Sequence, residues 1–309
     1  MNLTFSINQF RWTDTVRVVA FLNKLSGAEA TETELSERLF RQWHEMPGEN
    51  PELDCFIAET VRGEILGFLH MITEKPIRRS VAIQSVAQCT DRFAIAKHFA
   101  LTARKFAEDQ PTDVLHMQIN KEDHQWREAL EDTGWATVKE YWNLRWKSEN
   151  QSLLEKVSIP EGFGIRKLEL ATDIDIFTEI QNESFSDHWG FCPNTVEEIT
   201  ARILMERSGE DGILLVHQGT RIAGYNWTLY ASNGRAAIGW VGMTGVHPDY
   251  RGKKLGKAIV LTGMHELFER GANRIELEVD SENAPARELY YKLGFEKVSE
   301  TLWFESLLQ

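Results

Sequence analysis

The chain has few cysteines and no spacing of them that would hold a metal or a disulfide framework. Its 309 residues include three, Cys55, Cys89 and Cys192, which are widely separated and odd in number. They form neither a C-x-x-C pair nor a Cys/His cluster of metal-ligand spacing. This pattern favours a reducing compartment, and we expect no bound metal.

The chain also lacks long apolar runs and an excess of basic residues. No stretch of roughly eighteen uninterrupted apolar residues occurs, and the N-terminal residues do not read as a signal peptide. We therefore expect a cytoplasmic protein. The formal net charge of -13 opposes binding to nucleic acid or to an anionic membrane and would instead attract protonated amines.

What is present indicates two globular domains of ordinary size. The hydrophobic fraction is 42% and the charged fraction 26%. One order of elements is predicted twice: a strand, two helices, three strands, a helix, a strand, a helix and a closing strand. Thr133-Gly134-Trp135 matches Leu293-Gly294-Phe295 at an offset of 160 residues, which also aligns Arg127 with Arg287. A polar segment at 148–162 separates the copies.

These patterns predict the fold class and the domain boundaries. We expect a mixed α/β protein, with a mostly antiparallel sheet and flanking helices, that arose by duplication. The predicted domains are residues 1–148 and 149–309.

One strand-to-helix junction in the second copy has the composition of an anion site. It is the segment Val246 to Gly256, V-H-P-D-Y-R-G-K-K-L-G. The first N–H groups of a helix lack intrahelical partners and carry the positive end of the helix dipole, so phosphate oxygens fit there. Gly252 and Gly256 would allow close approach of a ligand. Basic side chains come from Arg251, Lys253 and Lys254. A basic surface turn without a ligand is the alternative.

The first copy has lost these features. The offset places Asp91 to Ala96 over Arg251 to Gly256, so both glycines are replaced by residues with side chains and an aspartate stands at the arginine position. We predict that the first copy kept the fold without the anion site.

A second motif follows the turn, and together they resemble the GCN5-related N-acetyltransferase (GNAT) superfamily. The family's acyl-CoA motif is R/Q-x-x-G-x-G/A, followed downstream by N-x-x-A-x-x-L-Y-x-x-x-G-F. The second motif is matched at every specified position by Asn283, Ala286, Leu289, Tyr290, Gly294 and Phe295. In the first motif Arg251 and Gly256 match, whereas Lys254 replaces the middle glycine.

The tandem arrangement resembles mycothiol synthase-like acetyltransferases. The run Asn182 to Gly190, N-E-S-F-S-D-H-W-G, is similar to a helix-loop segment of that group. The resemblance implies two GNAT-like acyl-CoA N-acyltransferase domains, of which only the C-terminal one is catalytic. It further implies that acetyl-CoA is the cosubstrate and that a primary amine of an unidentified small molecule attacks it directly.

The resemblance also assigns roles to residues. The turn backbone would hold the pyrophosphate and the strand 241–247 the pantetheine arm, with an N–H near Gly245 or Val246 polarising the thioester carbonyl. Tyr290 would protonate the departing thiolate, and Asn283 would bond the pantetheine amides. Expected cofactor contacts are Val246, Arg251, Gly252, Lys253, Lys254, Leu255, Gly256, Lys257, Asn283 and Ala286. The alternatives are that Asn283 only caps its helix and Tyr290 only packs in the core.

The attacking amine must lose a proton, so a base is required. We favour Asp187 or His188, with Phe185 and Trp189 lining the acceptor pocket. The other candidates are Glu183 and His247, and for His247 a structural role is the better interpretation.

Two other functions stay open at this point. One is a non-catalytic, regulatory acyl-CoA-binding module. The other is a tandem-GNAT transferase with a different acyl or aminoacyl donor, although the acidity of the chain counts against a tRNA. The sequence allows a monomer or a homodimer.

Overall fold

The computed structural model describes residues 4–27, 34–149, 154–233 and 236–308, so residues 150–153 of the predicted linker lie outside it. The chain divides into two compact units. Of the described residues, unit 1 contains those up to Tyr141 together with those from Ser299 onward, and unit 2 contains those from Trp142 to Val298. Every helix in the described ranges is too short or too polar to cross a lipid bilayer.

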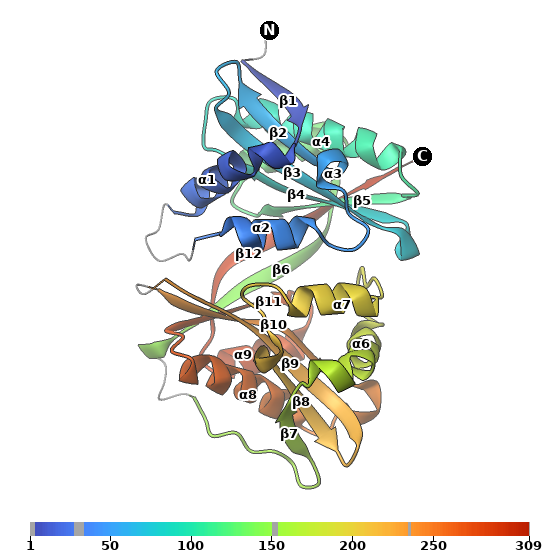
Figure 1. The fold of residues 1–309 in the computed structure, drawn as a ribbon, viewed down its shortest axis with the longest axis vertical. Coiled ribbons are helices and arrows are strands. Elements are labelled where there is room, and N and C mark those ends of the chain that lie inside the picture. Colours follow the sequence, from blue (N-terminus) through green and yellow to red (C-terminus); the bar gives the residue numbers. More distant parts are fainter. Residues whose placement is uncertain (1–3, 28–33, 150–153, 234–235, 309) are drawn as a thin grey trace. The chain divides into compact units, whose positions relative to one another are not determined.

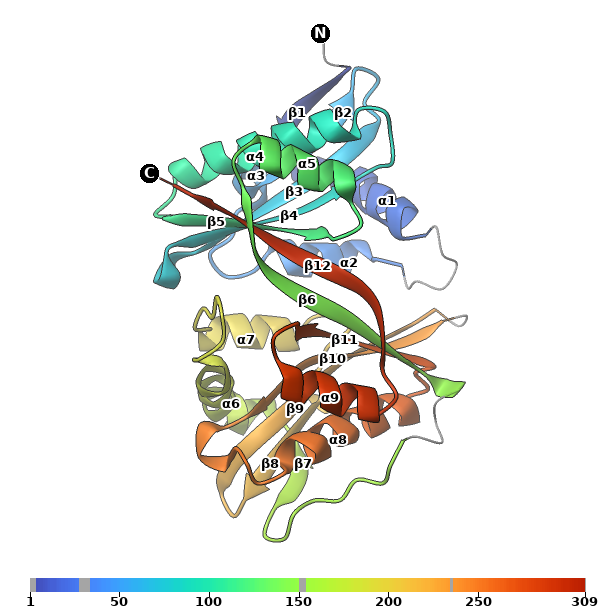
Figure 2. The same ribbon diagram turned by 180° about the vertical axis from the view of Figure 1, so that it is seen from behind.

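Unit 1 is a mixed sheet with helices on both faces. Its elements are β1 (Phe5–Gln9), α1 (Thr15–Ser26), α2 (Glu37–His44), α3 (Pro51–Asp54), β2 (Cys55–Thr60), β3 (Ile65–Glu74), β4 (Arg79–Val86), α4 (Arg92–Glu108), β5 (Val114–Asn120), α5 (His124–Asp132) and the start of β6 (Ala136–Lys147). The strand order is β1-β2-β3-β4-β5-β12, in which only β4 and β5 run parallel. Helices α1 and α2 cover the face seen in Figure 1, and α4 and α5 the face seen in Figure 2.

Unit 2 repeats this plan. Its elements are β7 (Gly164–Lys167), α6 (Leu170–Phe185), α7 (Val196–Ile203), β8 (Ile213–Gln218), β9 (Arg221–Ser232), β10 (Ala237–Val246), α8 (Leu255–Glu269), β11 (Arg274–Asp280), α9 (Ala284–Lys292) and the start of β12 (Glu296–Leu307). The strand order is β6-β11-β10-β9-β8-β7, with β10 and β11 parallel. Helices α8 and α9 cover the face seen in Figure 2, and α6 and α7 the opposite face.

The offset between the copies is maintained in space. Val114 and Arg274 begin equivalent strands, and His124 and Ala284 begin equivalent helices, each pair 160 residues apart. The glycines that follow these helices, Gly134 and Gly294, both have a positive φ, of 84° and 90°. The predicted mixed α/β class and the duplication are confirmed.

The compact units do not follow a single cut after residue 148, because the closing strands are exchanged. Strand β6 passes into unit 2 after Tyr141, and β12 passes into unit 1 after Val298. Residues 301–307 of β12 then pair antiparallel with β5, and Phe304 is fully buried in the core of unit 1. Each unit is therefore completed by a strand from the other half of the sequence.

Helix α8 packs closely on the sheet of unit 2, and this fixes the turn that precedes it. A Cβ added to Gly263 of α8 would lie 2.2 Å from Oδ1 of Asn226, and one added to Gly224 of β9 would lie 2.7 Å from the Ile259 side chain. Leu255 and Leu267 are buried against the strands. The start of α8 is thus held beside the C-terminal end of β10.

Candidate active site

The turn between β10 and α8 delays the start of the helix. After β10 the chain forms a short 3₁₀ turn, η5 (Pro248–Tyr250), and α8 begins only at Leu255. Gly252 has a φ of 77° and Lys254 a φ of 62°. Both lie in the left-handed region, which is incompatible with a right-handed helix, so the intervening residues stay outside α8.

This turn leaves backbone donors open. In the described part of the chain, the N–H groups of residues 252–257 donate to no protein acceptor, and Lys254 makes no side-chain cap bond. A Cβ built on Gly252 or Gly256 meets no atom within 4 Å. The start of α8 combines unpaired donors, the positive end of a helix dipole and open space, which are the requirements of a phosphate site.

The basic side chains of the turn already have neighbours. Lys253 Nζ lies 4.4 Å above the ring of Tyr250, and Lys257 Nζ pairs with Glu155 at 2.7 Å. The backbone of the turn is therefore better placed than these side chains to serve as the principal anion donor.

Arg251 is held by protein groups. Its Nη1 donates to Asp187 Oδ2 at 2.7 Å, and its Nη2 donates to Asp187 Oδ1 at 3.2 Å and to the carbonyl of Ser184 at 3.0 Å. The two-pronged ion pair connects the loop after α6 to the turn. Its hydrogen bonds lower the pKa of Asp187 to about 2, which makes that carboxylate a weak proton acceptor.

Strands β10 and β11 separate toward the same turn. Their parallel pairing extends only from Ile238 to Trp240 of β10, and a bulge lies between Val241 and Met243. From Met243 to Val246 the strand keeps its antiparallel pairing with β9. Its other edge offers the backbone groups that an extended pantetheine chain would pair with.

Tyr290 and Asn283 both have structural contacts. Tyr290 is 7% exposed and packs edge-on against Phe295, and burial raises its pKa to about 12. Asn283 caps α9 by accepting the Ala286 N–H at 3.2 Å, as Asp123 caps α5 in unit 1. The side-chain oxygen of Asn283 is used in capping, so its side-chain NH₂ group is the part that could donate hydrogen bonds to a cofactor.

The loop after α6 contains the candidate bases. His188 Nδ1 lies 3.3 Å from Asp187 Oδ1, and its ring contacts that of Phe185 in a tilted arrangement, with the centroids 4.7 Å apart. His247 accepts the Asp249 N–H at Nδ1, and its Nε2 lies 2.7 Å from Glu183. His247 therefore uses both ring nitrogens in holding the turn, whereas His188 has a carboxylate to orient it.

A group of buried polar side chains, not predicted from the sequence, lies beside Gly245. A Cβ on Gly245 would lie 2.7 Å from the Tyr225 ring and 2.8 Å from Ser184 Cβ. Ser184 Oγ, Tyr225 Oη and Gln181 Oε1 are buried without a hydrogen-bond partner. In the sequence, the only signal for these three polar residues is that they fall at core-facing positions of α6 and β9. They supply polar atoms next to the strand segment expected to hold the thioester.

The equivalent turn in unit 1 is closed. Helix α4 begins at Arg92, the counterpart of Gly252, and the N–H groups of Arg92 and Ile95 donate to the carbonyls of Cys89 and Asp91. The open first turn of unit 2 is here part of the helix.

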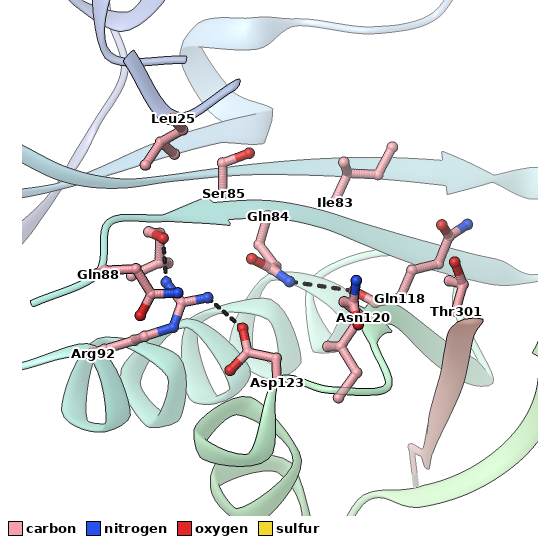
Figure 3. Close-up of a pocket in the computed structure, with 12 residues that line it drawn as sticks. Leu25, Ile83, Gln84, Ser85, Gln88, Arg92, Gln118, Asn120, Asp123 and Thr301 are labelled. Atoms are coloured by element: carbon pink, nitrogen blue, oxygen red, sulfur yellow. Dashed lines mark hydrogen bonds and ion pairs between the residues drawn. The ribbon is translucent and has the colours of Figure 1, made fainter. Parts of the chain in front are cut away.

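Side chains also fill the cleft where β4 and β5 separate. The Arg92 guanidinium donates to the carbonyls of Val86 and Ala87 and pairs with Asp123, and Gln84 donates to the carbonyl of Gln118 (Figure 3). A pocket of about 450 Å³ remains, but the carbonyls of Val86 and Gln118 in its lining already accept side-chain hydrogen bonds.

Comparison with known proteins agrees with this geometry. Residues 174–295 match the family model described as Acetyltransferase (GNAT) family. A mycothiol acetyltransferase of Kytococcus sedentarius is 32% identical over 151 residues, which are 48% of this chain and 50% of that protein. One from Pseudarthrobacter chlorophenolicus is 33% identical over 165 residues, covering 52% and 51%. The chain spans about half the length of these curated relatives.

Two solved structures have the same fold over almost the whole chain. A tandem GNAT protein from the clavulanic acid biosynthesis pathway superposes with a TM-score of 0.76 at 16% identity, covering 98% of each chain. A GCN5-related N-acetyltransferase from Sphaerobacter thermophilus gives 0.74 at 17% identity, covering 98% of this chain and 96% of that one. Residues 174–295 therefore match the Acetyltransferase (GNAT) family, about half of the chain is similar to mycothiol acetyltransferases, and the chain as a whole has the fold of a tandem GNAT protein.

Proposed function

We propose that the protein is an acetyl-CoA-dependent N-acetyltransferase that modifies a primary amine of a small molecule, with unit 2 as the catalytic domain. The observation that carries the proposal is the open turn at 252–257 beside the unpaired edge of β10. In unit 1 the equivalent turn is part of helix α4, and the Arg92 side chain bonds the carbonyls of Val86 and Ala87. The GNAT match in unit 2 and the mycothiol acetyltransferase relatives support acetyl transfer.

In the proposed mechanism the pyrophosphate of acetyl-CoA accepts hydrogen bonds from the backbone N–H groups of residues 252–257. The pantetheine arm forms backbone-type hydrogen bonds with the free edge of β10. The amine nitrogen attacks the thioester carbonyl, whose oxygen gains negative charge next to the N–H of Gly245 or Val246. The C–S bond then breaks, and the CoA thiolate takes a proton from Tyr290. With a pKa of about 12, Tyr290 remains a protonated donor at physiological pH.

We assign the removal of the amine proton to His188. Asp187 orients the His188 ring and anchors Arg251, so it acts as a positioning residue. The negative net charge of the chain favours the approach of a cationic amine.

The test is turnover by the purified full-length chain. Acetyl-CoA and a panel of small-molecule amines are mixed with the protein, and released CoA thiol and acetylated amine are both measured. Tyr290→Phe should lower kcat by about 10²- to 10⁴-fold while leaving the Kd for acetyl-CoA unchanged. Full turnover by Tyr290→Phe would remove the donor assignment. Tight CoA binding without turnover of any amine would favour a regulatory module instead.

A further inference from the structure

Three potential metal ligands come together in unit 1. Cys55 and His70 are direct cross-strand partners in the antiparallel pair β2–β3, so their side chains share one face of the sheet. His44 is the last residue of α2, which covers that face. One donor atom from each of the three lies within 4.8 Å of the others, and all three residues are buried.

Both imidazoles are oriented as metal ligands usually are. His44 Nδ1 bonds the carbonyl of Phe40 at 2.7 Å, which leaves Nε2 for a ligand. His70 Nε2 bonds the Glu49 carboxylate at 3.0 Å, which leaves Nδ1. A ligating histidine commonly gives its second nitrogen to a backbone carbonyl or a carboxylate, because that bond fixes the tautomer and the ring plane.

A second observation points to a missing partner. His44 is 5% exposed, and its Nε2 is buried without a hydrogen bond. Because the Phe40 carbonyl can only accept, Nδ1 of His44 is the protonated nitrogen, and in this neutral tautomer Nε2 carries a lone pair. A simple packing role among Phe40 and Phe68 would leave this lone pair unsatisfied, which is destabilising.

We propose that unit 1 binds one Zn²⁺ ion through His44 Nε2, Cys55 Sγ and His70 Nδ1. One thiolate and two imidazoles suit zinc, whose fourth position we assign to a solvent molecule. As the Zn–S bond forms, the Cys55 thiol releases its proton to solvent. The thiolate leaves a single positive charge on the site, and the Glu49 carboxylate bonded to His70 neutralises it.

The ion would join the end of α2 to the β2–β3 pair and thereby stabilise unit 1. It would take no part in acyl transfer, so the proposal is independent of the proposed function. The expectation of no metal was based on spacing along the chain, whereas strand pairing and the seating of α2 bring these ligands together.

The test starts with metal analysis of the purified full-length chain. We expect one zinc per chain that persists through gel filtration, and a rise in thermal midpoint when Zn²⁺ is returned to chelator-treated protein. Co²⁺ in place of zinc should give a thiolate-to-cobalt absorption band. Cys55→Ser should remove the band and the thermal shift. Cys89→Ser and His98→Gln are matched controls. Nδ1 of His98 bonds the carbonyl four residues earlier, as Nδ1 of His44 does, and both variants should keep the absorption band and the thermal shift.

Further variants protect the test against a folding defect in Cys55→Ser. His70→Gln should lose the zinc, and Glu49→Gln should bind it about 10- to 100-fold more weakly. The proposal would be overturned if chelator-treated wild type, after Zn²⁺ is added back, neither binds the ion nor gains thermal stability from it. Equal metal binding by folded His70→Gln and wild type would also overturn it, as would copper in place of zinc in the isolated protein.

Discussion

Gly256 is a residue at which folding and cofactor binding make opposite demands. It lies in the first turn of α8, where alanine is the better helix former, and a Cβ there meets no protein atom. We predict that Gly256→Ala raises the free energy of unfolding by about 0.5–1 kcal/mol. The same methyl group would occupy the space of a phosphate oxygen, so the Kd for acetyl-CoA should rise at least about tenfold. Calorimetric binding and denaturant unfolding measure the two effects.

Gly263 provides the control for this prediction in the same helix. A methyl group there would lie 2.2 Å from Asn226 Oδ1, so Gly263→Ala should lower stability. If Gly256→Ala bound acetyl-CoA as tightly as the wild type, the phosphate would not sit on this turn.

Asp187 should contribute nothing to the pH dependence of activity near neutrality. Its hydrogen bonds to Arg251 lower its folded-state pKa to about 2. The contribution of the Asp187–Arg251 ion pair to folding stability is therefore fully present above the unfolded-state pKa of Asp187, about 3.9, and is lost only as pH falls toward 2. Asp187→Asn should reduce kcat/KM without abolishing turnover, because it removes a positioning contact and no proton acceptor, whereas His188→Gln should lose most of kcat. Loss of most of kcat in Asp187→Asn together with full kcat in His188→Gln would return the base role to the carboxylate.

At the scale of the element, the left-handed conformation of Lys254 sets where α8 begins. A non-glycine residue in this conformation costs about 1 kcal/mol, and glycine is also a favoured N-cap residue. Lys254→Gly should therefore keep acetyl-CoA binding and change the unfolding free energy by about 0 to +1 kcal/mol, since glycine's greater unfolded-state entropy offsets part of the gain. Lys254→Val should lower the thermal midpoint, because a β-branched residue tolerates a positive φ poorly. Equal midpoints for the two variants would mean that the turn relaxes to another conformation.

The elements themselves were predictable because their signals are local. Apolar periodicity and the glycines after α5 and α9 indicated both copies, and the change from Gly252 to Arg92 indicated that the equivalent turn of the first copy differs. What the sequence did not reveal depends on long-range contacts. The pairing of Arg251 with Asp187, which makes the latter a weak base, joins residues 64 positions apart. The hydroxyls beside Gly245 likewise become a group only when α6 packs on β9 and β10.

At the scale of the whole molecule, the exchange of β6 and β12 is the main departure from the sequence-based boundaries. Period-two alternation predicts that a segment is a strand, but it does not specify the strand beside which that segment lies. A duplicated chain makes the problem harder, because equivalent strands of both copies have similar patterns and either could close either sheet.

The exchange predicts that two substitutions in the last strand act on the first unit very differently. Phe304 is fully buried in the core of unit 1, whereas Leu307 is 66% exposed on the same strand. Phe304→Ala should lower the unfolding free energy of unit 1 by about 3–5 kcal/mol, and Leu307→Ala by less than about 0.5 kcal/mol. Hydrogen exchange provides the readout, since amides of β5, which pair with residues 301–307, should lose protection in Phe304→Ala only. Unchanged protection of β5 in that variant would mean that the last strand closes the sheet of its own half of the chain.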